Sequence, residues 1–283
     1  MIDERTTTGA VTLHVNDVEK QTDFYTDVIG LETLETQDDG VTLGTAERPL
    51  LHLRHLPDGQ VNRRAAGLFH LALRVPSRAD LAAWFHHYAE SGTPNLQGAS
   101  DHGVSEAIYL SDVERNGIEV YRDRLSTEWD RRADGSVALN GTRSLDLERL
   151  LDEHDGAWDG IPAGTDMGHI HLKVPNLDAA RRFYVDVLGF EVQTEMGNSA
   201  LFISAGGYHH HLGINTWHMR HGTVNTADTF GLAQFDLQFA DETARDDVLK
   251  RVSDDDGVQI HADGDAPIVT DPFDNKIRLI VAN

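Results

Sequence analysis

The 283-residue chain contains no cysteine, and this absence excludes disulfides and any metal site built on thiolates. A metal, if one binds, must therefore be held by histidine and carboxylate side chains. No run of 18 apolar residues occurs, so we expect no membrane-spanning helix. The first nine residues, Met-Ile-Asp-Glu-Arg-Thr-Thr-Thr-Gly, lack the apolar segment of a signal peptide, which indicates a cytoplasmic protein.

Lysine is scarce as well. Only 4 lysines accompany 20 arginines, 32 aspartates and 15 glutamates, and the formal net charge is −23. A field of this sign repels nucleic acid and anionic membrane surfaces, so the sequence predicts neither as a partner. The acidic residues are scattered along the chain, and we interpret them as an adaptation to a high-salt cytoplasm. An acidic surface for a cationic partner is the alternative.

The sequence repeats itself after 159 residues. The stretch Phe-Tyr-Thr-Asp-Val-Ile-Gly-Leu at 24–31 returns as Phe-Tyr-Val-Asp-Val-Leu-Gly-Phe at 183–190. The match continues without a gap from Ala10 to about Leu53, which places Ala10 on His169 and His52 on His211. A period of this length indicates a duplicated domain rather than a solenoid of short repeats.

Each copy looks internally doubled, which gives four modules that consist of a strand, a helix and several further strands. The opening strands alternate in polarity, as strands with one buried face do. They are expected at residues 10–15, 68–75, 168–174 and 232–237. The first helix should begin at a cap formed by Asn16 or Asp17 and end at Gly30.

This organisation predicts an α+β protein with two tandem domains. The amino-terminal domain covers residues 1–125 and the carboxy-terminal domain covers residues 167–283, with two modules in each. Residues 126–166 form an acidic spacer, which has one predicted helix near 145–154.

Several motifs resemble the vicinal oxygen chelate superfamily, which includes glyoxalase I, extradiol ring-cleaving dioxygenases and bleomycin-binding proteins. They are the four βαβββ modules, Phe-Tyr-x-Asp-x-(Ile/Leu)-Gly after the first helix, and a closing Asp-x-x-x-Asn-(Gly/Lys)-Ile strand. The segments 100–106 and 206–217 are similar to a branch labelled catechol-2,3-dioxygenase-like. The resemblance covers nearly the whole chain outside the spacer. It implies that modules pair into half-open barrels, with metal ligands on the first and last strands of the paired modules.

Those two strand positions carry metal-ligand residue types chiefly in modules two and three. In chain order, the positions hold Ala10 and His52, His70 and Glu119, His169 and His211, and Gln234 and Arg278. We expect modules two and three to pair, because only this pairing fills every position with a ligand.

The predicted ligand set is therefore His70, Glu119, His169 and His211. If modules one and two pair instead, the set becomes His52, His70 and Glu119. If modules three and four pair, His169 and His211 lie beside Gln234 and Arg278. Histidine and carboxylate ligands with open positions suit Fe(II), our first choice, and also suit Mn, Ni or Zn.

Three further residues are candidates for catalysis. His209 or His210 could act as the acid–base group beside the metal, because imidazole exchanges protons near neutral pH. The plain structural alternative for the run 209–211 is three surface histidines. Tyr121 could donate a hydrogen bond to a substrate oxygen, although packing is the commoner role of such a tyrosine.

The resemblance and the His/Glu set together imply extradiol cleavage of a catechol, with Fe(II) holding both substrate oxygens and O₂ as the second substrate. A glyoxalase-type isomerase or lyase is the second interpretation, and a small-molecule binding protein without enzymatic activity is the third. The sequence leaves the substrate open. It permits a homodimer without demonstrating one.

Overall fold

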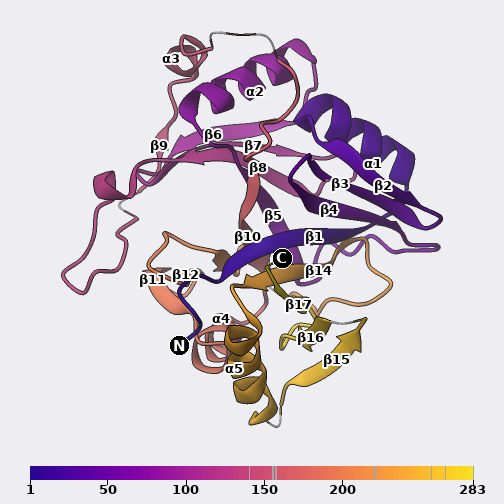
Figure 1. Cartoon of the computed structure of the whole chain (residues 1–283), viewed down its shortest axis with the longest axis vertical. Coiled ribbons are helices and arrows are strands. Elements are labelled where there is room, and N and C mark those ends of the chain that lie inside the picture. Colours follow the sequence, from indigo (N-terminus) through magenta and orange to yellow (C-terminus); the bar gives the residue numbers. More distant parts are fainter. Residues whose placement is uncertain are drawn as a thin grey trace.

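The structure is a computed structural model, and it describes residues 1–139, 141–154, 156, 158–219, 221–255, 257–264 and 266–282. Strands predominate and form two large mixed sheets, with helices on their outer sides (Figure 1). The α+β class and the four modules predicted from the repeat are confirmed. Among the helices of the described segments, none combines the length and the apolar character that a bilayer crossing requires.

The first two modules hold these elements. Module one contains β1 (Thr7–Val15), α1 (Val18–Phe24) with the π-helical turn η1 (Tyr25–Ile29), β2 (Glu32–Gln37), β3 (Gly40–Thr45) and β4 (Arg48–His55). Module two contains β5 (Gly67–Arg74), α2 (Arg78–Glu90), β6 (Leu96–Asp101), β7 (Ser105–Ser111) and β8 (Gly117–Asp123). The spacer holds the 3₁₀ turn η2 (Ser126–Glu128), β9 (Arg143–Ser144) and α3 (Leu147–Leu151), which is the helix predicted there.

The last two modules repeat this order. Module three contains β10 (Asp166–Lys173), α4 (Leu177–Arg181) with the π-helical turn η3 (Arg182–Val187), β11 (Glu191–Met196), β12 (Ala200–Ser204) and β13 (Leu212–Asn215). Module four contains β14 (Gly231–Phe239), α5 (Glu242–Ser253), β15 (Gln259–Asp263), β16 (Ala266–Thr270) and β17 (Lys276–Val281).

Each sheet is built from both halves of the chain. The order β11-β12-β13-β10-β5-β8-β7-β6-β9 joins modules two and three, and the order β15-β16-β17-β14-β1-β4-β3-β2 joins modules one and four. The first strands of the paired modules meet antiparallel in each sheet, β5 with β10 and β1 with β14. The expected pairing of modules two and three is therefore present within one chain. The domain boundaries at residues 125 and 167 stay a prediction.

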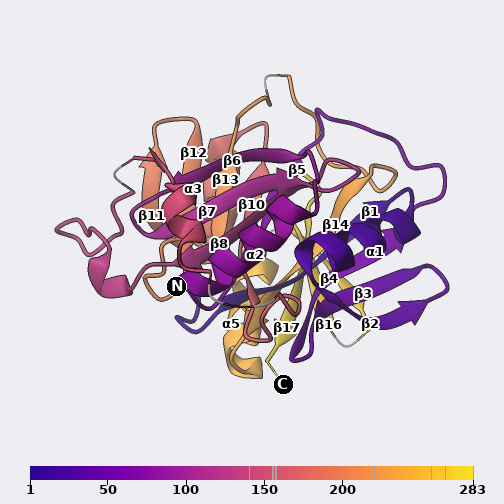
Figure 2. The same cartoon turned by 90° about the horizontal axis from the view of Figure 1, so that it is seen from above.

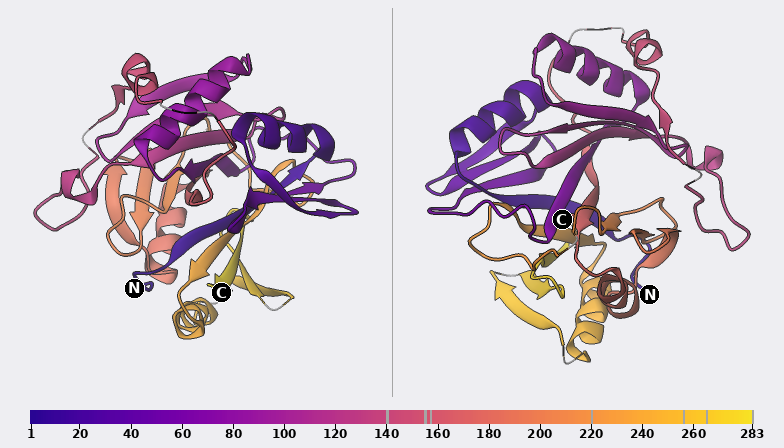
Figure 3. Two further views of the ribbon diagram at one scale, coloured as in Figure 1. Left: turned by 45° about the horizontal axis from the view of Figure 1, so that its top comes forward. Right: turned by 180° about the vertical axis from the view of Figure 1, so that it is seen from behind.

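Helix caps fix where the helices begin. The side chain of Asp17 accepts a hydrogen bond from the Lys20 backbone N–H, and Ser77 caps α2 through Asp80 in the same way. Gly30 ends the first helix with a φ of 89°, a left-handed conformation that glycine adopts readily. The helix α2 then lies against the turn η1 that follows α1 (Figure 2), and α5 lies against the turn η3 that follows α4 (Figure 3).

The tyrosine of the repeated Phe-Tyr-x-Asp motif has a structural role. The Tyr25 hydroxyl donates to Asp112 at 3.2 Å, and the Tyr184 hydroxyl donates to Asp271 at 2.8 Å. Each aspartate also accepts backbone and side-chain N–H groups of the turn before the last strand of its module. The motif therefore ties the helix of one module to the closing strand of the next, and the same bond occurs in both copies.

Candidate metal centre

Three neighbouring strands present the candidate ligands. His70 lies on β5, Glu119 on β8 and His169 on β10, and β5 is the central strand of the three. Ala72 of β5 lies opposite Glu119 on one side and opposite His169 on the other. Residues two apart on a strand point to the same face, so His70 and Ala72 share the face on which the other two side chains converge. The methyl group of Ala72 leaves room between them.

The three side chains meet at one point. The Nε2 atom of His70 lies 3.0 Å from Glu119 Oε2, and the Nε2 atom of His169 lies 3.1 Å from the same oxygen. The two Nε2 atoms are 3.3 Å apart. No other group of three or more potential ligands gathers this closely among the residues that the structure describes.

These separations fit a divalent metal ion. Two ligand atoms at right angles on an ion with bonds of about 2.1 Å lie about 3.0 Å apart, whereas tetrahedral ligands lie about 3.4 Å apart. The separations of 3.0 and 3.1 Å are nearer to the first value, and the separation of 3.3 Å is nearer to the second, so all three lie within the range that a divalent ion spans. Two histidines and one carboxylate on one face of an octahedron leave the other positions open for substrates.

The group is buried, and burial and neighbouring charges shift the pKa values of Glu119 and His169. The exposed fractions of His70, Glu119 and His169 are 6%, 3% and 1%. Burial alone would raise the pKa of Glu119, but the neighbouring His169 and His70 outweigh it and hold that pKa well below its ordinary value. Burial lowers the pKa of His169 to about 4, against the opposing effect of Glu119. Near neutral pH these two residues are therefore in the deprotonated forms that bind metal.

Enlarging Ala72 should separate the ligands. In Ala72→Val we expect metal affinity to fall by about 10–100-fold, the range for changes that misorient ligands, because the added methyl groups enter the space beside Glu119 and His169. Titration calorimetry with Zn²⁺ measures the affinity. The control is Ala200→Val, which enlarges a fully buried alanine of β12 in the same sheet. Equal affinities in the two variants would contradict this role of Ala72.

Aromatic rings surround the three candidate ligands His70, Glu119 and His169, which are called the metal group below. The ring centroids of His210 and His169 are 4.2 Å apart, and those of His171 and His70 are 4.8 Å apart. The ring of Phe202 contacts both His210 and His171, with centroid distances of 5.1 Å and 5.7 Å. Two further rings complete this lining, those of Phe69 and Trp217. The candidate centre is thus enclosed by aromatic and imidazole rings.

The predicted catalytic residues all lie near this group. His210 contacts His169 directly, and His209 is fully buried one residue away, with its Nδ1 atom 2.8 Å from His210 Nδ1. The ring of Tyr121 lies 4.9 Å from that of His169, but its hydroxyl is bonded to the Tyr208 hydroxyl at 2.8 Å. Tyr121 therefore contacts the metal group with its ring and a second tyrosine with its hydroxyl.

His211 lies outside the group. Its Nδ1 atom accepts the Ala205 backbone N–H at 3.2 Å, and its ring packs on Tyr208. The predicted equivalence with His52 assumed a constant offset of 159 residues. In β1 and β4, Thr12 is opposite His52, whereas in β10 and β13 the counterpart pair is His171 and Gly213. The number of residues that separates corresponding positions of the two copies is therefore larger by two at the last strand than at the first. As a result Gly213, and not His211, corresponds to His52.

Several residues near the centre were not predicted. Asp123 accepts from His209 Nε2 at 2.9 Å and pairs with Arg74 at 3.0 Å. Tyr109 lies opposite Glu119 across β7 and β8, and its hydroxyl is 2.7 Å from His102 Nε2. The sequence carries no direct sign of these contacts, because they depend on the register between strands rather than on local spacing.

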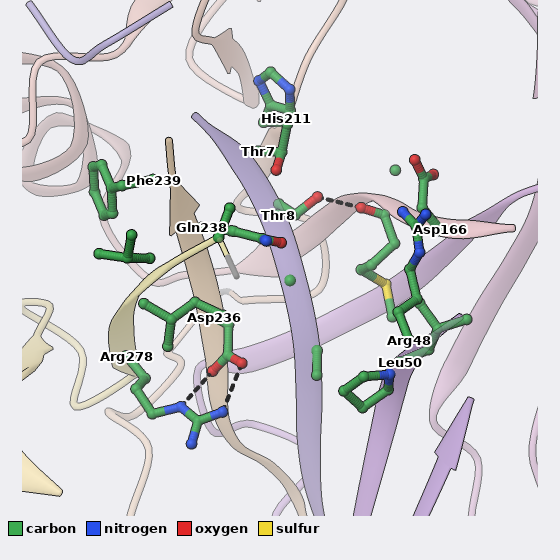
Figure 4. A pocket seen from close by; sticks show the side chains of 18 of the residues that line it. Thr7, Thr8, Arg48, Leu50, Asp166, His211, Asp236, Gln238, Phe239 and Arg278 are labelled. Atoms are coloured by element: carbon green, nitrogen blue, oxygen red, sulfur yellow. Dashed lines mark hydrogen bonds and ion pairs between the residues drawn. The ribbon is translucent and has the colours of Figure 1, made fainter. Parts of the chain in front are cut away.

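A cavity of about 610 Å³ lies between the two sheets (Figure 4). In this cavity Arg278, which aligns with Glu119, makes two bonds of 2.9 and 2.8 Å to the buried Asp236. Ala10 aligns with His169, and it lines the same cavity. Where modules two and three bring the candidate ligands together, modules one and four hold an arginine–aspartate ion pair, whose guanidinium group would repel a cation.

His52, which also lines this cavity, makes stability depend on pH. Burial lowers its pKa from 6.5 to about 4, and the nearby Arg278 and Arg54 add to the shift. Between these values the unfolded chain binds a proton that the folded protein does not, so stability falls as pH falls through this window. We expect His52→Gln to reduce the slope of the free energy of unfolding against pH by up to about 1.4 kcal/mol per pH unit in this window. Urea unfolding at several pH values measures this, and an unchanged slope would contradict it.

Known proteins are similar to this chain over most of its length. The sequence matches the Glyoxalase/Bleomycin resistance protein/Dioxygenase superfamily over residues 7–120 and 166–279. It is 39% identical over 256 residues to a catechol-2,3-dioxygenase of Bacillus subtilis (strain 168), and the match covers 89% of each chain.

Solved structures with the same fold are more distant in sequence. A provisionally assigned dioxygenase from Bacillus subtilis is 13% identical, with a TM-score of 0.65 over 97% of this chain and 85% of the other. Glyoxalase I from Zea mays is also 13% identical, with a TM-score of 0.56 over 98% of this chain and 92% of its own. At this level of identity the similarity concerns the fold.

A buried group of two histidines and one carboxylate on duplicated βαβββ modules defines a protein built to hold a divalent metal ion. The chain belongs to the Glyoxalase/Bleomycin resistance protein/Dioxygenase superfamily, the vicinal oxygen chelate proteins that the motifs had indicated.

Proposed function

We propose that the protein is a metal-dependent extradiol dioxygenase that cleaves a catechol-like aromatic diol with O₂. The observation that carries this proposal is the convergence of His70, Glu119 and His169 within 3.3 Å of one another. The aromatic surroundings of the group and the 39% identity to a catechol-2,3-dioxygenase support it.

The proposed ligands are these three residues, and Fe(II) is the proposed metal, with Mn, Ni or Zn as the other ions that such ligands bind. His211 is left out of this set because its ring faces Tyr208 and the cavity between the sheets. When bound, Fe(II) would supply Lewis acidity and open positions for the two adjacent substrate oxygens and for O₂.

The surrounding side chains have distinct proposed roles. Phe69, Phe202 and Trp217 would pack against the aromatic ring and exclude water from it. His210 would accept the proton of a substrate hydroxyl, because its ring lies directly against the ligand His169. His209 and Tyr121 would act through their neighbours, since their polar atoms are already bonded within the protein.

The test is turnover by protein loaded with Fe(II) under anaerobic conditions. We expect O₂ uptake and a coloured ring-opened product with catechol or a substituted catechol, and neither with His70→Ala. The proposal fails if no diol causes O₂ uptake or changes the spectrum of the loaded protein. Isomerisation of a thiol hemiacetal with Ni or Mn and without O₂ uptake would identify a glyoxalase-type enzyme instead. Ligand binding without any bound metal would identify a binding protein.

The proposed partners are a small oxygenated aromatic substrate and O₂. A homodimer and a cytoplasmic location stay predictions from the sequence. Measurement of the mass in solution by light scattering would test the first of them, with about twice the chain mass of 31.3 kDa expected for a dimer.

A further inference from the structure

The metal group is closed off from solvent, so a path to it has to open. The exposed fractions of 6%, 3% and 1% leave little surface from which an ion or an organic molecule could reach the ligand atoms. A buried site of this kind fills and empties when a neighbouring segment moves. The segment that moves is expected to have few buried apolar contacts, because such segments open at the lowest free energy.

The chain between β8 and β9 fits that description, and its residues 126–139 are called the strap below. Among the described residues 126–139 and 141–144, Val137 is the only buried apolar side chain, and it lies outside the main hydrophobic core. The segment after β9 differs, because Leu145 and Leu150 belong to that core. The strap is therefore held in place chiefly by hydrogen bonds.

These hydrogen bonds attach the strap to one edge of the sheet that carries the metal group. Backbone bonds fold residues 130–138 into a hairpin, which lies against the edge strand β11. Arg132 Nη1 donates to the Gln193 backbone oxygen at 2.7 Å. The Val137 backbone N–H donates to Gln193 Oε1 at 3.1 Å, and the Thr194 hydroxyl donates to the Val137 backbone oxygen at 2.7 Å.

The same stretch of chain reaches the opposite edge of the sheet, where it ends in β9 beside β6 (left side of Figure 1). Between the two edges it contacts neighbours of the metal group. The ring of Trp129 lies 5.3 Å from that of His209, and the Thr142 hydroxyl lies 3.2 Å from His102 Nδ1. The other nitrogen of His102 is bonded to Tyr109, whose ring contacts the metal group. The stretch therefore lies across the face of the sheet that carries this group.

We propose that the strap is a gate, which must leave β11 before an ion or a substrate can reach the metal group. It opens at β11 rather than at β9, because β9 is followed by a segment anchored in the core, whereas the hairpin is attached chiefly by hydrogen bonds. This inference rests on the metal centre of the proposed function and adds a conformational step to it.

Metal exchange measures the opening of the gate without any turnover. A gate that does not touch the ion changes the rates of association and dissociation by the same factor, so Kd is unchanged. Arg132→Ala and Thr194→Val each remove hydrogen bonds to β11. In each we expect both rates for Zn²⁺ to rise by about 3–10-fold, with Kd within about twofold. Stopped-flow mixing with a coloured zinc chelator measures the rates, and calorimetry measures Kd.

The control is Arg149→Ala, which removes an exposed arginine of α3 in the same spacer and should leave both rates unchanged. Two results would overturn the proposal. Rates that stay unchanged in Arg132→Ala and Thr194→Val would show that the strap does not block the path. A rise in the dissociation rate alone would show that the strap supports the ligands instead of gating them.

Hydrogen exchange tests the opening independently of the metal. The amides of Val137 and Ile170 are both buried and both hydrogen-bonded, the first in the strap and the second in β10. We expect the Val137 amide to exchange at least about 100-fold faster, because it needs only a local opening. If Zn²⁺ does not bind, the proposed metal centre fails, whereas this comparison still decides whether the strap opens. Exchange at Val137 as slow as at Ile170 would contradict the gate.

Discussion

Replacing Glu119 with glutamine is expected to abolish tight metal binding, and with it all metal-dependent activity. Glu119 is the only carboxylate within the group, so the variant leaves two neutral imidazoles and an amide around the ion. Divalent ions bind charged oxygen far better than amide groups in a dry site, and we expect affinity to fall by more than about 100-fold.

Titration calorimetry with Mn²⁺ or Zn²⁺ measures this loss. The matched control is Glu106→Gln on β7, because Glu106 is equally buried but is bonded to Arg78 and Arg122 rather than to histidines. The control should lose stability and retain metal affinity. Retention of affinity within about threefold in Glu119→Gln would show that the metal is held elsewhere.

The second large effect concerns the sheet that modules one and four form, in which Arg278 stands at the position of Glu119. Arg278→Ala should lower the free energy of unfolding by about 3–5 kcal/mol, because the carboxylate of Asp236 keeps its burial and loses a guanidinium that bonds it at two points. The exposed fraction of the Asp236 side chain is 3%, which leaves little access for water.

Urea unfolding measures the change, and Arg54→Ala is the control. Arg54 pairs with Asp39, whose side chain is 71% exposed, so its loss should cost no more than about 1 kcal/mol. The double variant Asp236→Ala with Arg278→Ala should be more stable than Arg278→Ala alone, because no buried charge remains at that position. Metal affinity should be unchanged throughout. An effect of Arg278→Ala as small as that of Arg54→Ala would contradict this account.

The sequence predicted the fold well because the repeat carries most of the information. The offset between the two Phe-Tyr-x-Asp motifs defined the modules, and the distribution of histidine and glutamate among them favoured the pairing that the strand order shows. Three of the four predicted ligands, His70, Glu119 and His169, lie together for the same reason. Each lies within a strand of seven or eight residues whose apolar pattern makes it recognisable in the sequence.

The other contacts of the site depend on the register between paired strands, which a single sequence does not specify. His211 precedes a short strand whose pairing is displaced by two residues between the copies, so the gapless match misplaced it. Asp123 is 86 residues from His209 in the sequence and Asn215 is 44 residues from His171, although each pair is joined by a hydrogen bond. Such contacts arise only when strands are aligned, because a side chain's neighbours across a sheet are set by the pairing.

The internal duplication allows the two pairs of modules to be compared position by position. One pair of modules keeps two histidines and a glutamate on its central strands, and the other has Ala10, Gln234 and Arg278 at the matching positions. The βαβββ scaffold and its tyrosine–aspartate bonds persist in both copies. The metal group is therefore a feature of one half-barrel rather than a requirement of the fold.

The most direct test is the metal content of protein purified without oxygen or chelators, determined by elemental analysis beside His70→Ala. The account predicts close to one divalent ion per chain, iron in the first place, and its loss in the variant. Absence of metal from both proteins after reconstitution with Fe(II), Mn(II), Ni(II) and Zn(II), or equal metal in both, would contradict it.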